Sequence, residues 1–290
     1  FPPEMCYSFD VAKIVAKLGF SWIIVDEISF DGKLGNVKDN TIYQVDGLGD
    51  FYVFFKERPF SAGFTYGKYP NAQLFVKALE NKLDCHCYLL TGTDGEIYGH
   101  HRPGQEELLS EAFDQGNPRA CTISELLRLF PSKETVSPLP SSWSTWEDEM
   151  SQGTPYPQWL YPDHELHLLQ WSLTNLAIEI MKQTPQEAEG YEKARHLLDE
   201  GLHSCQYWWA SCRPWWDTGM IEAGAQRLYD AIQRISHAVP VNKLQEASAL
   251  FNSIKETAKR WHSTGKADAL KQKYLQEHGE VTSELTFGQH

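Results

Sequence analysis

A proline-rich stretch at residues 131–162 divides the chain into two halves with different hydrophobic patterns. Six of its residues are proline, so we expect no regular helix or strand there. Before it, short apolar runs alternate with amphipathic segments, which is the order of an α/β protein. After it, apolar residues recur every three or four positions, which predicts a helical bundle. We therefore expect a β/α domain at 1–130, a connection at 131–162 and an α-helical bundle domain at 163–290.

The first half contains the signals of a β/α alternation. Ser8 is a suitable N-cap, and Gly19 follows the last apolar position of the helix that Ser8 would start. The polar segment 32–49 is long enough to carry substrate contacts or a lid. Helices are predicted at residues 9–19, 72–82, 105–113 and 124–130, and strands at 21–25, 51–56 and 85–91.

The second half is predicted to be helical and is rich in tryptophan. Nine of the ten tryptophans lie at or after Trp143. Aromatic rings can stack on flat or ring-shaped ligands, although packing in a core is their commoner role. We expect Trp143, Trp146 and Trp159 to be core residues between the domains. Helices are predicted at residues 166–180, 187–209, 217–238, 242–262 and 266–277.

Charge and hydropathy exclude several partners. The 290 residues include 26 Lys and Arg and 39 Asp and Glu, which gives a net charge of −13. Without a basic stretch, such a chain repels a phosphate backbone, so we expect no nucleic acid partner. Apolar runs such as residues 22–25 are far too short to cross a membrane. A neutral ligand fits this composition better.

Six cysteines are spread along the chain. Cys85 and Cys87 would place both sulfurs on one face of the strand predicted at 85–91, where they could bind a metal. No further ligands occur at the spacing of a zinc site, so we expect buried, reduced thiols and no metal. Reduced thiols favour a cytoplasmic protein.

Two acidic residues stand where a β/α fold places its ligands. Glu4 follows two prolines that fix its backbone, and Asp94 follows the predicted strand 85–91 between Gly92 and Gly95. Glycines let the backbone approach a ligand closely, and ligands of such folds bind at the C-terminal ends of strands. Two simpler roles remain open, since an acid near a helix start stabilises the helix dipole and Asp94 could lie in a solvated turn.

Four segments resemble motifs of glycoside hydrolase family 57, a group of retaining enzymes that act mostly on α-glucans. FPPEMCYS at residues 1–8 resembles the nucleophile segment, with Glu4 in that position, and TDGEIYG at 93–99 resembles the acid/base segment, with Asp94 in that position. IVDE at 24–27 resembles the following strand. SCQYWW at 204–209 is similar to the aromatic segment of the family's helical region.

This resemblance implies a fold and an activity. The expected fold is a partial (β/α)7 barrel followed by an α-helical bundle, without the family's two upstream motifs. Because the chain starts at Phe1, we expect it to be the C-terminal part of a longer polypeptide. The expected activity is hydrolysis or transglycosylation of α-glucans, of the amylase or 4-α-glucanotransferase type, through a glycosyl-enzyme and without cofactor or metal. The substrate is an oligo- or polysaccharide, and its expected contacts are Asp26, Glu96, His100, His101, Trp208 and Trp209.

Two other functions remain open from the sequence. Asp94 with His100 and His101 could bind a divalent metal, as in polysaccharide deacetylases, although adjacent histidines on an extended segment would face opposite ways. A barrel that has lost turnover could also serve as a glycan-binding module.

Overall fold

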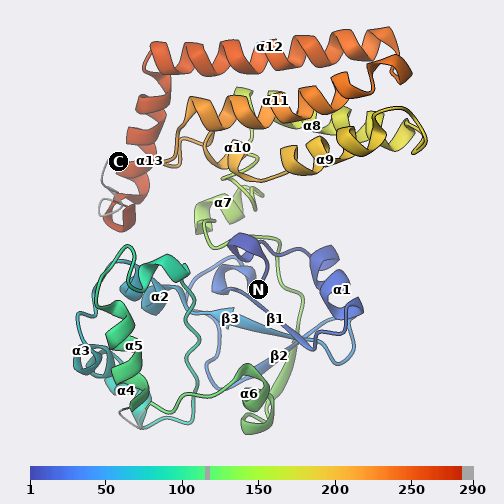
Figure 1. Ribbon diagram of the computed structural model, residues 1–290. Coiled ribbons are helices and arrows are strands. Elements are labelled where there is room, and N and C mark those ends of the chain that lie inside the picture. Colours follow the sequence, from blue (N-terminus) through green and yellow to red (C-terminus); the bar gives the residue numbers. More distant parts are fainter. Residues whose placement is uncertain (115–117, 283–290) are drawn as a thin grey trace. The chain divides into compact units, whose positions relative to one another are not determined.

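The computed structural model describes residues 1–114 and 118–282. The chain divides into two compact units, Phe1–Tyr156 and Pro157–His290. The first unit combines a sheet with helices, and the second is built of helices (Figure 1). The boundary lies inside the predicted connection 131–162, and residues 131–156 of that connection belong to the first unit.

A four-stranded mixed sheet runs through the described part of the first unit. Its order is β1-β3-β2-β4. Strand β1 is parallel to β3, with Trp22 beside Tyr52 and Asp26 beside Lys56, while β2 is antiparallel to β3 and parallel to β4. The sheet confirms the α/β class, and a partial barrel is not confirmed. The strands are β1 (Trp22–Asp26), β2 (Ile42–Val45), β3 (Tyr52–Lys56) and β4 (Lys133–Val136).

Two predictions for this unit were wrong, the strand at 85–91 and the absence of regular structure at 131–162. Residues 85–91 form an irregular segment instead of a strand; Tyr88 N donates to Asp39 O at 2.7 Å and Leu90 O accepts from Glu57 N at 2.9 Å. Their apolar character serves packing, since the Tyr88 ring lies 6.2 Å from the ring of Phe54. The polar segment 32–49 contains β2, and the proline-rich stretch contains β4 and the short helix α7 (Glu147–Ser151). Strand β4 is polar and lies at the sheet edge, so it has no apolar pattern.

Short helices complete the first unit. Ser8 Oγ accepts from Val11 N at 3.2 Å, so the predicted N-cap of α1 is confirmed. Helix α2 was not predicted, because it begins at Arg58 directly after β3. Side chains of β1, β2 and β3 form one apolar core, and α2, α3 and α5 share another. The helices are α1 (Phe9–Lys17), α2 (Arg58–Thr65), α3 (Ala72–Ala78), α4 (Glu80–Leu83), α5 (Gln105–Asp114) and α6 (Ile123–Leu129).

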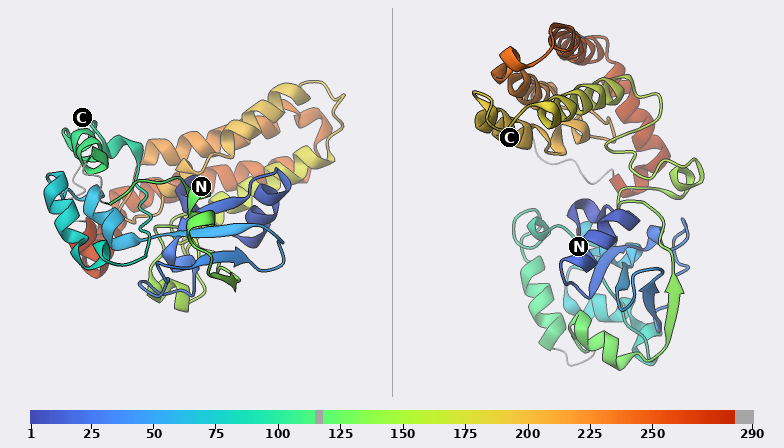
Figure 2. Two further views of the ribbon diagram at one scale, coloured as in Figure 1. Left: turned by 90° about the horizontal axis from the view of Figure 1, so that it is seen from below. Right: turned by 90° about the vertical axis from the view of Figure 1, so that its right-hand side faces the viewer.

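The second unit is the predicted helical bundle. Helices α8, α9, α11 and α12 lie side by side around a core that includes Leu173, Ile221 and Leu228 (Figures 1 and 2). The single helix predicted at 187–209 is divided after Gly201, whose carbonyl accepts from Gln206 Nε2 at 2.8 Å. The helices are α8 (Glu165–Gln183), α9 (Tyr191–Gly201), α10 (Cys205–Trp208), α11 (Thr218–Arg234), α12 (Val241–Ser263) and α13 (Lys266–Thr282). None of the described helices combines the length and apolar character of a membrane span.

Two histidines are buried at the start of α8. His164 is the N-cap and accepts from His167 N at 3.1 Å, and the two rings stack at 3.9 Å. Burial, together with the charges of Lys266 and Arg213, lowers the pKa of His164 to about 4, and burial lowers the pKa of His167 well below its usual value. The folded bundle therefore excludes protons that the unfolded chain binds.

We expect this bundle to lose stability as the pH falls from about 6.5 to about 4, by roughly 1.4 kcal/mol per pH unit for each histidine. The sign follows because the folded pKa lies below the unfolded one, so stability is full above pH 6.5. Urea unfolding at pH 7, 6 and 5 measures this dependence. His164→Asn keeps an N-cap residue and should flatten the curve; an unchanged slope would exclude His164 as its source.

Candidate active site

Glu4 lies in a strained turn at the start of the chain. It is the middle residue of η1 (Pro3–Met5), with φ at +55°, and Met5 follows with φ at +47°. Such left-handed backbone is unfavourable for residues other than glycine, by roughly 1–2 kcal/mol each. The turn is held by hydrogen bonds from Met5 N to Pro2 O at 2.9 Å and from Cys6 N to Pro3 O at 3.0 Å, and by burial of Met5. These contacts fix the backbone position from which the Glu4 side chain extends.

The Glu4 carboxylate is bound by a tryptophan from far along the chain. Trp143 Nε1 donates to Glu4 Oε2 at 2.6 Å, and Trp143 N donates to Glu4 O at 3.2 Å. Burial raises the pKa of Glu4, the indole hydrogen bond opposes that rise, and the charge of Asp94 adds to it. Burial and the charge of Glu4 together raise the pKa of the neighbouring Cys6 thiol to about 12.

Asp94 reaches the neighbourhood of Glu4 because Gly92 permits a close approach. A Cβ atom at Gly92 would lie 2.8 Å from Met5 Cε and 3.3 Å from Lys56 Cδ. Gly92 N also donates to Ser61 Oγ at 3.1 Å, which fixes the segment against α2. Asp94 is itself exposed, but partial desolvation and the charge of Glu96 raise its pKa, while Lys56 and His101 lower it. Asp94 therefore lies near enough to Glu4 for its charge to raise the pKa of Glu4.

The other predicted residues of this loop are exposed. Glu96, His100 and His101 follow Asp94, and Glu96 O accepts from His101 N at 2.7 Å. The two histidine rings stack at 4.5 Å, so the expectation that they face opposite ways was wrong. Within residues 1–114 and 118–282, no three His, Cys, Asp or Glu side chains gather into a set that could hold a metal ion. The metal-dependent alternative therefore has no ligand set in this part of the chain.

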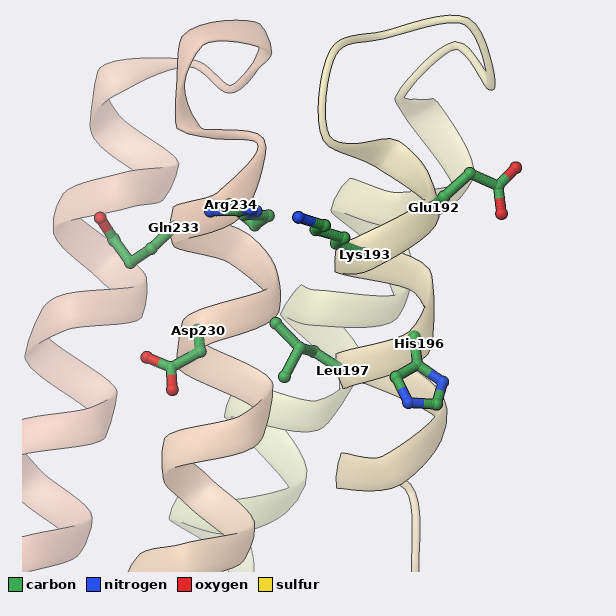
Figure 3. A pocket seen from close by; sticks show the side chains of 7 residues that line it. All are labelled: Glu192, Lys193, His196, Leu197, Asp230, Gln233 and Arg234. Carbon is green, nitrogen blue, oxygen red and sulfur yellow. The ribbon is translucent and has the colours of Figure 1, made fainter.

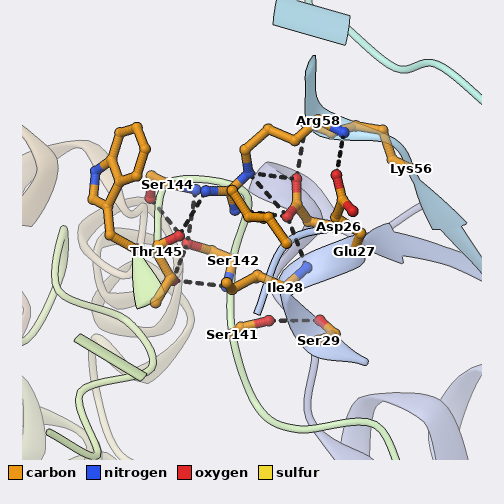
Figure 4. A network of polar contacts seen from close by, with 12 residues as sticks. Asp26, Glu27, Ile28, Ser29, Lys56, Arg58, Ser141, Ser142, Ser144 and Thr145 are labelled. Carbon is orange, nitrogen blue, oxygen red and sulfur yellow. Dashed lines mark hydrogen bonds and ion pairs between the residues drawn. The ribbon is translucent and has the colours of Figure 1, made fainter. Parts of the chain in front are cut away.

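Asp26 is fully buried in a network of charges instead of facing a ligand (Figure 4). Arg58 Nη2 donates to Asp26 Oδ1 at 2.6 Å, and Lys56 Nζ lies 3.0 Å from Asp26 Oδ2. Burial alone would raise the pKa of Asp26, but the charges of Arg58 and Lys56 lower it below its usual value. The role of Asp26 in this structure is to fix these two cations.

The same network holds the segment that carries Trp143. Arg58 Nη1 donates to Thr145 O at 2.9 Å, and Lys56 Nζ lies 5.0 Å from the centre of the Trp143 ring. Glu27 accepts from Arg58 N at 2.6 Å and is also buried. The sequence interpretation missed Trp143, Lys56 and Arg58 as site residues. The two cations were detectable, because they directly follow or end a buried apolar run.

Residues 1–138 match the model of glycosyl hydrolase family 57. The match covers 138 of the 290 residues, just under half of the chain. The 4-α-glucanotransferase from Thermococcus litoralis has a similar fold, with a TM-score of 0.54 and 15% sequence identity over 79% of this chain and 41% of that chain. This chain therefore spans about two fifths of the length of that protein, and no curated protein sequence matches it.

Trp208 and Trp209, the two tryptophans predicted to contact the substrate, lie in the second unit, outside the residues that match the family model. The Trp208 ring is 5.5 Å from that of Trp159 and 6.3 Å from that of Trp215, and the Trp209 ring is 5.3 Å from that of Trp215. Both are half-buried, so each retains some exposed ring surface. Contact of either ring with a sugar at Glu4 and Asp94 stays a prediction.

A groove in the second unit holds none of the predicted site residues. It lies between α9 and α11, and its lining mixes both signs of charge around one leucine (Figure 3). Such a lining is typical of solvated helix surfaces. The residues are Glu192, Lys193, His196, Leu197, Asp230, Gln233 and Arg234.

We expect Asp26→Asn to lower the free energy of unfolding of the first unit by about 3–5 kcal/mol, because the substitution leaves the cations of Lys56 and Arg58 without their carboxylate partner. Urea unfolding measures the loss. Asp39→Asn is the matched control: Asp39 pairs with Lys82 near the surface, where loss of a pair costs about 1 kcal/mol or less. Equal losses in the two variants would contradict a special role of Asp26.

Proposed function

We propose that this chain carries both catalytic carboxyls of a retaining α-glucan hydrolase or glucanotransferase, with Glu4 as nucleophile and Asp94 as acid/base. The observation that carries the proposal is geometric: Gly92, two residues before Asp94, packs against Met5, the residue after Glu4, and the charge of Asp94 accordingly raises the pKa of Glu4. The match of residues 1–138 to glycosyl hydrolase family 57 and the fold of a 4-α-glucanotransferase support it. The activity is proposed for the polypeptide that includes this chain, with the sheet as part of a β/α barrel.

The first step needs opposite protonation states in the two acids. The Glu4 carboxylate attacks the anomeric carbon while Asp94 gives its proton to the leaving glycosidic oxygen, so that the carbon–oxygen bond breaks and a glycosyl ester forms on Glu4. The indole of Trp143 stabilises the ionised form of Glu4. Partial desolvation and Glu96 favour the protonated form of Asp94.

The second step restores both groups. Asp94, now a carboxylate, takes a proton from water or from a sugar hydroxyl, and the resulting oxygen attacks the anomeric carbon and releases Glu4. Water as acceptor gives hydrolysis, and a sugar gives transfer. Glu96, His100 and His101 lie on the loop of Asp94, where they are exposed to a sugar bound there. Trp208 or Trp209 would supply a stacking ring from the helical unit.

Glu4→Gln and Asp94→Asn should each lower activity on maltooligosaccharides in the full-length protein. We expect a loss of about 10²- to 10⁴-fold for Asp94→Asn, since it removes the proton donor, and a loss at least as large for Glu4→Gln. Release of products from maltotetraose provides the measurement. Asp10→Asn, on the exposed face of α1, is the control and should retain activity. Near-normal turnover by either carboxyl variant would sink the assignment.

Removal of divalent metal should leave this activity unchanged, because the proposed steps use only carboxyl groups. Turnover of maltotetraose is compared before and after dialysis against a chelator, and release of acetate from an acetylated polysaccharide is assayed in parallel. Loss of maltotetraose turnover in chelator, or metal-dependent acetate release, would favour a deacetylase instead.

A further inference from the structure

The indole ring of Trp143 lies between a carboxylate and a buried cation. Its N–H donates to Glu4 Oε2 at 2.6 Å, and its face is 5.0 Å from Lys56 Nζ. Lys56 is only 5% exposed, and its ammonium is held 3.0 Å from Asp26 Oδ2. Side chains from four separate segments are therefore linked by successive contacts, in the order Asp26, Lys56, Trp143 and Glu4.

A cation over an aromatic face draws electron density from the ring. The attraction grows when the cation is removed from water, as Lys56 is here. An indole that gives up electron density has a more positive N–H and donates more strongly to an anion. Hydrogen bonds to an ionised acceptor favour the ionised form, so a stronger donor holds Glu4 as a carboxylate.

We propose that Trp143 is a positioning residue for the Glu4 carboxylate and that Lys56, fixed by Asp26, acts on Glu4 through the ring of Trp143. The inference rests on the proposed role of Glu4 as nucleophile. The two carboxyls differ in which of these residues they neighbour. Trp143 bonds to Glu4, whereas the stem of Lys56 lies beside Gly92 on the segment that carries Asp94.

Asp26 weakens the effect of the Lys56 charge on the protonation of Asp94. A bare ammonium beside Asp94 would favour the ionised form of a group that must start protonated. Asp26 neutralises much of the Lys56 charge, while the ring of Trp143 still receives the face of the ammonium. Asp26 and Lys56 therefore serve both acids at once, and a change at Lys56 reaches both, whereas a change at Trp143 reaches Glu4.

The test is a direct titration of Glu4 in the whole chain. Glutamate is labelled with ¹³C at Cδ, and the Glu4 signal is identified by its loss in Glu4→Gln. Trp143→Phe keeps a ring under Lys56 and removes the N–H, and should move the Glu4 midpoint up by about one pH unit or more. Trp146→Phe is the matched control, because the Trp146 ring lies over Arg58 and should leave that midpoint unchanged. An unmoved midpoint in Trp143→Phe overturns the proposal.

A second variant tests the route through the ring. Lys56→Met should raise the Glu4 midpoint when residue 143 is Trp and leave it unchanged in the Trp143→Phe background. Equal shifts in both backgrounds would mean that Lys56 acts on Glu4 directly, which overturns the proposed route. If circular dichroism shows that Trp143→Phe is misfolded, 3-benzothienylalanine at position 143 keeps the fused ring without the N–H and replaces it in the titration.

Turnover separates this inference from the proposed function. In the full-length protein, Trp143→Phe should move the acidic limb of the kcat/KM profile up by the same amount as the Glu4 midpoint. An unmoved midpoint together with an inactive Glu4→Gln overturns the inference alone. A shifted midpoint together with an active Glu4→Gln overturns the proposed function, and the positioning role with it.

Discussion

The buried carboxylate of Asp26 joins three elements of the first unit beside Glu4 and Asp94. It ends β1, and the two cations that it binds come from the end of β3 and the start of α2. Arg58 extends this network to the carbonyl of Thr145, and Glu27 accepts from the Arg58 backbone. Two acids and two bases leave no net charge in the buried group, which is the condition under which buried ions are tolerated.

The pair of carboxyls depends on this network indirectly. Glu4 keeps its carboxylate in place through Trp143, and Trp143 stands on the segment that Arg58 ties to the sheet. Asp94 depends on a different device, the close packing of Gly92 on Met5 and Lys56. The site is therefore assembled by three contacts between distant segments, each made by a residue that does no chemistry itself.

The sequence allowed the parts with local signals to be predicted. The cap of α1, the apolar runs of β1 and β3, and the helices α8, α11, α12 and α13 follow from spacing and composition. Glu4 and Asp94 were predicted through motif resemblance, and the structure packs Gly92, two residues before Asp94, against Met5, the residue after Glu4.

The remaining features depend on partners that a single segment does not reveal. Strand β4 forms by pairing with β2 at the sheet edge, where polar side chains remain exposed. Residues 85–91 stay irregular although their composition suits a strand. Asp26 was expected to meet a substrate, since an acid at a strand end often does, but its neighbours in space are Lys56 and Arg58. Trp143 could be recognised only once its segment was placed beside Glu4.

The neutral thiol of Cys6 has a consequence for chemical selectivity. Sulfur is a better nucleophile than a carboxylate, and a thiolate two residues from Glu4 would compete for any electrophilic carbon bound there. Burial and the Glu4 charge raise the pKa of Cys6 to about 12, so the group stays a thiol at neutral pH. Burial, reinforced by the charge of Glu4, thus keeps the thiolate population negligible, and the same protonation state makes Cys6 a poor target for alkylating reagents and peroxides.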